Sequence, residues 1–354
     1  MKKTILNETP VRTAVNFNIN NISLDNIDIP NNLPKFQNIE IKYDESKVKV
    51  TDSIERQDIE YGILDELTDK TFSNANSNIN IEIKENIEEN IRINFKFDNA
   101  NKVLVDNMKI ISDKNTSSTV VLKYDSDNKD SYFHNQVLKV IAKENSNLNI
   151  VLVNFMNTLS TNLIAIDSII EDNAKLNYVV VDLGGKYSIT NYYSNLVGKS
   201  SENLINAIYL GNDDQFFDLN YISHLRGEKS NVNIEVQGAL KDESKKHFKG
   251  TIDFKKGSKK SIGNENESCM LLSDKAKSIS LPMLLCSEED VKGNHSSSAG
   301  KIDPKVLFYI MTRGFDLKDA MKLVVKAKFD KILENIEDAK LKKEIIDKID
   351  EKID

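Results

Sequence analysis

The sequence contains few of the residues that most often build disulfide, catalytic or metal sites: two cysteines, four histidines and no tryptophan in 354 residues. The pair Cys269 and Cys286 excludes a disulfide framework and cannot hold a metal cluster by the common four-cysteine scheme. Such low cysteine usage favours a reducing, cytoplasmic setting. Any metal cluster that this chain touches is therefore expected to be shared with another chain.

Long apolar runs, a signal peptide and stretches of one-signed charge are also missing. No run of about 18 apolar residues exists, so the sequence predicts no membrane-spanning segment. The net charge of −7 mixes both signs and shows no basic stripe, which argues against nucleic acid as a partner. The apolar fraction of 39% and the mean hydropathy of −0.43 favour a thin, elongated core.

Motifs typical of common enzyme classes are absent. The chain has no phosphate-binding loop, no G-x-S-x-G elbow, no H-E-x-x-H helix and no C-x-x-C pair. The isolated pair Gly184 and Gly185 predicts a turn. We therefore expect a protein that is not an enzyme.

The middle of the chain contains alternation and a loose repeat. From about residue 78, apolar and polar residues alternate, which predicts strands with one buried face. Similar segments recur at intervals of about 28 residues. We align them on four asparagines: Asn149, Asn177, Asn206 and Asn233. Two strand-like halves per repeat fit the coils of a β-solenoid, and an antiparallel sandwich remains the alternative.

Composition divides the chain into three parts. Residues 1–75 hold three of the five prolines and predict an extended, peripheral segment with one short helix near residues 53–68. Residues 76–300 form the strand-rich core, and residues 301–354 are helical. The last boundary is sharp, because Asn335 is the only asparagine after residue 300.

The helical part carries start and stop signals. Asp303 and Pro304 predict an N-cap followed by proline at the first helical position, and Gly314 predicts a C-terminal cap. Asp316 starts a second helix. We expect one apolar face on that helix: Ala320, Leu323, Val324 and Ala327. Such a tail either caps a solenoid or docks a partner, and the sequence leaves both open.

The cysteines and histidines differ in their expected surroundings. Cys269 and Cys286 border apolar runs, so we expect both to be buried. His295 lies among glycine, asparagine and serine in a segment that predicts a loop, where it is available for ligation or proton transfer. The other histidines are expected in or beside strands: His134, His224 and His247.

Three segments carry a family resemblance: HFKGTIDF, MLLSDKAKSISLPMLLCSEEDVKGNHSSSAGKID and LFYIMTRGFDLKDAMKLVVKAKF. They resemble the SufB/SufD family of iron–sulfur cluster assembly proteins, the SufD branch more closely. The first 75 residues are less similar to that family. The resemblance implies a mainly β fold, with a parallel, right-handed β-helix core and a C-terminal α-helical domain.

The resemblance also implies partners. Such proteins form a scaffold with a SufB-type chain and the ABC-type ATPase SufC, and their C-terminal helices hold the ATPase. The expected docking residues follow one another closely: Phe308, Tyr309, Arg313, Gly314 and Phe315. No cofactor is expected to stay bound, and a transient Fe–S cluster would be shared with the partner chain.

Site residues follow from the resemblance one position at a time. His295 matches the family histidine at the heterodimer interface and is the candidate metal ligand, shared with a partner chain. Glu267 stands where SufB-type chains carry a cysteine, and Cys269 lies two residues further on. Ser296 and Gly293 replace a carboxylate and a cysteine of sister proteins. The cluster or interface candidates are therefore His295, Cys269 and Glu267, in a chain that acts as the SufD-like half.

Two other functions stay open. A homodimeric scaffold would act without a separate SufB-type chain. A carbohydrate-active enzyme on a β-helix is less favoured, because the chain lacks tryptophan for sugar stacking and a signal for export.

Overall fold

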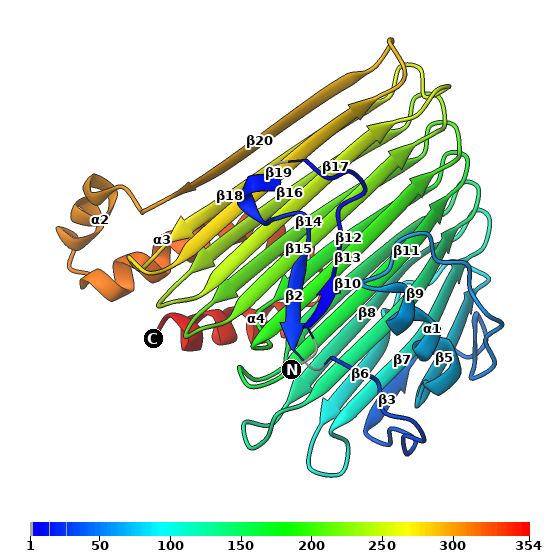
Figure 1. Cartoon of the computed structure of the whole chain (residues 1–354), viewed down its shortest axis with the longest axis horizontal. Coiled ribbons are helices and arrows are strands. Elements are labelled where there is room, and N and C mark those ends of the chain that lie inside the picture. Colours follow the sequence, from blue (N-terminus) through cyan, green and yellow to red (C-terminus); the bar gives the residue numbers. More distant parts are fainter. Residues whose placement is uncertain (1–2, 14, 26) are drawn as a thin grey trace.

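Parallel β-strands make up most of the protein, in a computed structural model that describes residues 3–13, 15–25 and 27–354. The long strands form two nine-stranded sheets. From β5 onward, consecutive strands alternate between the sheets, and each strand pairs in parallel with the strand two positions further on. The chain therefore winds as a solenoid of about eight turns (Figure 1).

We name the two sheets after their last strands. The β20 sheet contains, in spatial order, β20 (Lys292–Gly300), β18 (Ile262–Leu271), β16 (Asn231–Leu240), β14 (Glu202–Gly211), β12 (Lys175–Asp182), β10 (Asn147–Phe155), β8 (Ser117–Ser126), β6 (Ile91–Phe97) and β3 (Ile39–Lys42). The β19 sheet contains β19 (Lys277–Cys286), β17 (Lys245–Phe254), β15 (Phe216–Leu225), β13 (Tyr187–Leu196), β11 (Thr161–Ile170), β9 (Phe133–Ala142), β7 (Val103–Ser112), β5 (Ser77–Ile83) and β4 (Val48–Thr51). Only β3 and β4 run antiparallel to their neighbours in these sheets, as far as the chain is described. The predicted parallel β-helix is thus confirmed and the sandwich is excluded.

Asparagine recurs because it suits two positions in each coil. In the β20 sheet, Asn149 and Asn177 lie side by side, and the Asn177 amide donates to Asn149 Oδ1 at 2.8 Å. At one corner, Asn115, Asn145 and Asn173 adopt the left-handed backbone conformation, with φ of 61°, 59° and 54°. Asparagine tolerates this conformation better than most residues.

The predicted alignment of the repeats is wrong in one coil. Leu204, and not Asn206, pairs with both Asn177 and Asn233. Asn206 lies two residues further along the same strand, on the same face. Since side chains alternate with a period of two, a shift of two residues leaves the buried pattern unchanged and hides the error.

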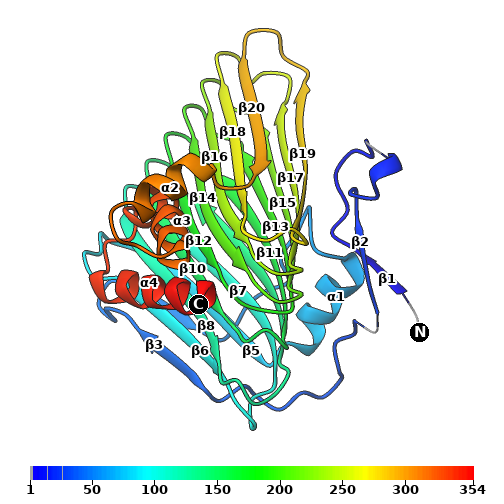
Figure 2. The same cartoon turned by 90° about the vertical axis from the view of Figure 1, so that its left-hand side faces the viewer.

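The N-terminal elements lie along the outer face of the β19 sheet (Figure 2): β1 (Lys3–Leu6), the 3-10 helix η1 (Val15–Phe17), β2 (Ile22–Asp25) and α1 (Asp65–Asn74). The helix expected near residues 53–68 is therefore displaced towards the C-terminus. Asp65 and Glu66, which favour a helix N-terminus, occupy its first turn, so the helix begins only after Leu64.

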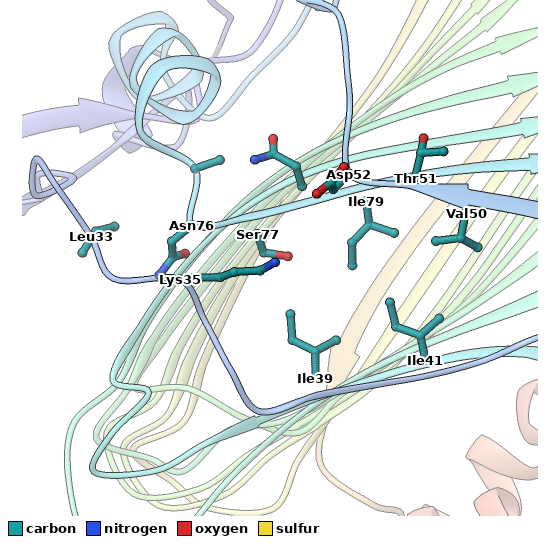
Figure 3. A pocket seen from close by; sticks show the side chains of 12 residues that line it. Leu33, Lys35, Ile39, Ile41, Val50, Thr51, Asp52, Asn76, Ser77 and Ile79 are labelled. Atoms are coloured by element: carbon teal, nitrogen blue, oxygen red, sulfur yellow. The ribbon is translucent and has the colours of Figure 1, made fainter.

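A cavity of about 750 Å³ lies at the start of the solenoid, between β3, β4 and β5 (Figure 3). Its lining mixes apolar side chains, among them Ile39, Ile41 and Val50, with the charged Lys35 and Asp52. It is at the opposite end of both sheets from β19 and β20.

Three helices follow the last strand: α2 (Pro304–Met311), α3 (Leu317–Leu333) and α4 (Ala339–Ile353). The predicted N-caps are confirmed, because the Asp303 carboxylate accepts from the Lys305 amide and that of Asp316 accepts from the Asp319 amide. Helices α3 and α4 lie along the outer face of the β20 sheet (Figure 2). They cover a flank of the solenoid and leave its C-terminal end open.

The face of α3 that contacts the sheet differs from the expected one. Ala320 is buried as predicted, and Val324 is partly buried against the same cluster, but Leu323 and Ala327 are exposed. The buried residues of α3 are Ala320, Val325, Phe329, Ile332 and Leu333. Both stripes are apolar, so periodicity alone does not tell which one meets the sheet. Within the described residues, no helix is long and apolar enough to cross a membrane.

Candidate functional site

The open C-terminal end of the solenoid holds the predicted cluster or interface residues. β20 is the last strand of its sheet, so one of its edges has no partner strand within the described chain. Every residue of β20 is exposed. The expectation that His295 lies in a loop is wrong, because His295 belongs to β20. Polar residues on both faces of an uncovered edge strand resemble a loop in sequence.

Register brings the candidates together on one face of two neighbouring strands. β18 pairs with β20 so that Glu265 is opposite His295, Glu267 is opposite Ser297, and Cys269 is opposite Ala299. Residues at alternate positions share a face, and Glu265, Glu267 and Cys269 are buried between the sheets. His295 therefore has Glu265 as its neighbour, a residue that no pattern in the sequence indicates.

Glu267 is fully occupied by hydrogen bonds. Its Oε1 accepts from Lys246 Nζ at 2.7 Å and from Tyr209 Oη at 3.1 Å. Its Oε2 accepts from the hydroxyls of Ser280 and Ser297, both at 2.9 Å. The side chains of Lys246 and Glu267 are both 0% exposed. Glu267 is therefore a structural residue, buried in an ion pair with Lys246. Its hydrogen bond from Ser297 also ties β20 to β18.

Glu265 is buried without such partners. Its residue exposure is 2%, and neither carboxylate oxygen has a hydrogen-bond partner among the described residues. The side chain reaches across to Gly250 on β17, where a Cβ atom would lie 2.3 Å from the Glu265 carboxyl carbon. Burial, and then the charge of Glu267, raise the pKa of Glu265 to about 8.

The two cysteines have different surroundings. Cys269 is buried as predicted, and burial raises the pKa of its thiol, which disfavours the reactive thiolate. Cys286 is exposed, so its predicted burial is wrong. It ends β19, the last strand of the second sheet, and no further coil covers it within the described chain. No group of three potential metal-ligating side chains occurs among the described residues.

The remaining histidines lie in strands, as predicted. His134 is 0% exposed, and its Nδ1 lies 2.7 Å from Asn162 Oδ1. Burial lowers the pKa values of His134, His224 and His247 to about 4. These imidazoles are neutral and packed in the structure.

A second candidate surface, the α2–α3 patch, is formed by the exposed apolar side chains of α2, α3 and the turn between them. Helix α2 has no buried residue, and Figure 1 shows it standing away from the sheets. Phe308, Tyr309 and Phe315 are 69%, 59% and 45% exposed. The patch also includes Val306, Met311, Leu317 and Leu323. Large exposed apolar patches are typical of interaction surfaces.

Arg313 and Gly314 shape this patch. The Arg313 guanidinium lies 5.2 Å from the centre of the Tyr309 ring and donates to the Tyr309 hydroxyl at 3.0 Å. Gly314, with φ of +100°, makes the turn that leads into α3. The five residues expected to dock an ATPase are therefore grouped at one corner of the protein.

Comparison with known proteins identifies related sequences. Residues 95–328 match the family model described as "SUF system FeS cluster assembly, SufBD core domain". The chain is 25% identical over 254 residues to the iron–sulfur cluster assembly protein SufD of Bacillus subtilis, an alignment that covers 71% of this chain and 58% of that protein.

Two further relatives agree with this match. One is an iron–sulfur cluster assembly SufBD family protein of Pyrococcus horikoshii, 32% identical over 167 residues, which are 46% of this chain and 36% of the relative. The other is SufD of Escherichia coli, 23% identical over 237 residues, an alignment that covers 67% of this chain and 56% of that protein. The chain thus spans about half the length of the curated relatives it matches.

Proposed function

Because the chain belongs to the SufBD family of iron–sulfur cluster assembly proteins, we propose that it is a SufD-like scaffold subunit of a cytoplasmic assembly complex. It is not an enzyme in this proposal and holds no cofactor stably. A transient cluster, the cargo of the complex, is shared with a partner chain. The observation that carries the proposal is the open C-terminal end of the solenoid, where His295 is exposed on an unpaired strand.

Strand β20 is the surface proposed to pair with a SufB-type chain. The Lys292 amide points towards β18 and donates to the carbonyl oxygen of Ser261, just before that strand, at 3.0 Å. Since backbone groups alternate along a strand, the N–H and C=O groups of His295 and Ala299 face the free edge. Unpaired edges of this kind accept a strand from another chain.

His295 is proposed to supply one ligand at that interface. A neutral imidazole binds iron well, and thiolate ligands are left to the partner, because Cys269 is buried and Glu267 is held by Lys246. This division suits the SufD-like half of a shared site.

The α2–α3 patch is proposed to dock a SufC-type ABC ATPase. Its aromatic side chains and Arg313 are residue types enriched in protein interfaces. Because α3 is anchored on the β20 sheet through Val325 and Phe329, movement of a docked ATPase would be passed on to the solenoid.

A homodimer is the second candidate, supported by the charges that flank β20. If two copies paired antiparallel about a two-fold axis near Ser296, the acidic residues Glu288–Asp290 of one copy would approach Lys301 and Lys305 of the other. Such a dimer would replace the SufB-type partner while leaving the α2–α3 patch free.

Co-expression with a SufC-type ATPase tests the docking proposal. Phe308→Asp places a charge in the α2–α3 patch and should abolish co-purification of the ATPase. Phe17→Asp is the matched control, because Phe17 and Phe308 are each 69% exposed. Equal recovery of the ATPase with both variants would contradict docking at this patch.

A further inference from the structure

The unpartnered carboxyl group of Glu265 is the most unusual buried group at the open end. Buried carboxylates are normally paired or hydrogen bonded, since an unsatisfied charged group costs several kcal/mol. The neighbouring Glu267 follows that rule with four donors. Glu265 has none among the described residues, although it is 2% exposed.

The residues around Glu265 in the described chain give its carboxyl no hydrogen bond. Towards the inside of the solenoid it lies over Gly250, which has no side chain to offer. On the open side, Gly250 pairs with Pro282 of β19, which has no N–H group. Glu265 pairs with His295 of β20. Both oxygens are therefore best reached from the open end, past His295.

Charge in this layer favours a cation. Lys246 is paired with Glu267 at 2.7 Å and is fully buried with it, so that pair is neutral as a unit. Near neutral pH the buried Glu265 carboxyl mostly keeps its proton when nothing is bound; once it gives up that proton, it adds one uncompensated negative charge beside the imidazole of His295, which a bound cation would balance. A carboxylate oxygen next to an imidazole nitrogen is a donor set used for divalent first-row metals, including ferrous iron.

Resting on the proposed function at the open end, we propose that Glu265 and His295 together form this chain's half of a ferrous-iron site. Glu265 supplies the carboxylate ligand that anchors iron within the last coil, and His295 supplies the imidazole at its mouth. The other coordination positions face the partner chain, which brings its own ligands. Iron bound here is cargo for assembly.

The proposal explains why an unsatisfied carboxyl is kept in the core. Residues that serve function commonly lower the stability of the folded chain. Glu265→Gln preserves the size of the side chain and removes its ability to ionise. We expect this variant to melt at the same temperature as the parent or above it when metal is absent. In the parent chain, metal should raise the melting temperature.

Titration of the full chain with Co²⁺ under nitrogen tests the site, because cobalt bound to nitrogen and oxygen ligands is visible by absorption. The parent should bind one Co²⁺ ion, and Glu265→Gln and His295→Ala should each weaken binding about tenfold or more. Fe²⁺ added during a Co²⁺ titration should compete for the same site.

Asp106→Asn is the matched control, since Asp106 is also a fully buried, inward carboxyl with a raised pKa, in β7. It should leave Co²⁺ affinity unchanged. Equal affinity of the parent and Glu265→Gln, or no binding to the parent, would overturn the proposal. Either result would leave partner pairing and ATPase co-purification intact, so failure here is distinguishable from failure of the proposed function.

Discussion

The buried ion pair between Lys246 and Glu267 should dominate the stability of the last coils. Both side chains are 0% exposed, and their charged atoms lie 2.7 Å apart. Removing one partner of such a pair leaves a buried charge uncompensated and costs about 3–5 kcal/mol. Glu267→Gln keeps the shape of the side chain while leaving Lys246 charged, so we expect it to lower the free energy of unfolding by that amount.

A second pair supplies the control. Lys275 and Glu243 lie 2.6 Å apart, nearly the same distance, but are 75% and 60% exposed. Solvent screens an exposed pair, which therefore contributes little, so Glu243→Gln should change stability little. The double variant Lys246→Met with Glu267→Gln should recover a large part of the loss, because no uncompensated charge remains.

Urea unfolding followed by circular dichroism measures these differences, and hydrogen exchange localises them. Exchange should quicken first in β17, β18 and β20, which surround the pair. If Glu267→Gln and Glu243→Gln are destabilised equally, the account of Glu267 as a structural ion-pair partner is refuted.

Further predictions concern the pH dependence, the helices and the N-terminal strand. Burial raises the pKa of Asp106 to about 7 from 3.8, so the folded chain keeps a proton that the unfolded chain releases. The contribution of Asp106 to stability should therefore fall between about pH 4 and pH 7, by up to about 4 kcal/mol. The difference in urea midpoint between the parent and Asp106→Asn isolates this contribution and should follow this curve. Phe329→Ala removes a fully buried aromatic ring between α3 and the sheet and should lower the free energy of unfolding by about 3–5 kcal/mol. Leu323→Ala, at an exposed position of the same helix, should lower it by less than about 0.5 kcal/mol. The rate of proteolysis within the helices measures both effects. Asn7→Ala removes a 2.7 Å hydrogen bond to Asp218 and should speed hydrogen exchange in β1 and β2, while unchanged exchange would contradict that contact.

The class of fold was predictable because one physical pattern repeats. Alternation of apolar and polar residues, a period near 28 residues and the absence of asparagine after residue 300 apart from Asn335 all indicate a solenoid followed by helices. The caps Asp303 and Asp316 are local signals and were placed correctly. Register was not predictable to better than two residues, as Leu204 and Asn206 demonstrate.

The candidate site was predictable only in part, because exposure at the open end depends on which coil comes last. Cys286 borders apolar residues and was expected to be buried, but β19 has no later strand to cover it in the described chain. Glu265 was missed because both faces of β18 carry polar residues, from Asn264 to Ser268. Only the pairing with β20 assigns Glu265 to the inner face and places it beside His295.

The mass of the assembly formed in cells tests whether this chain is a SufD-like scaffold subunit. The full chain, tagged and purified with its partners at low salt, should give a native mass equal to this chain plus a SufB-type chain and a SufC-type ATPase. Ala299→Pro, which blocks the free edge of β20, should lose the SufB-type chain and keep the ATPase. Recovery of the parent as a monomer, with neither partner, would contradict the account.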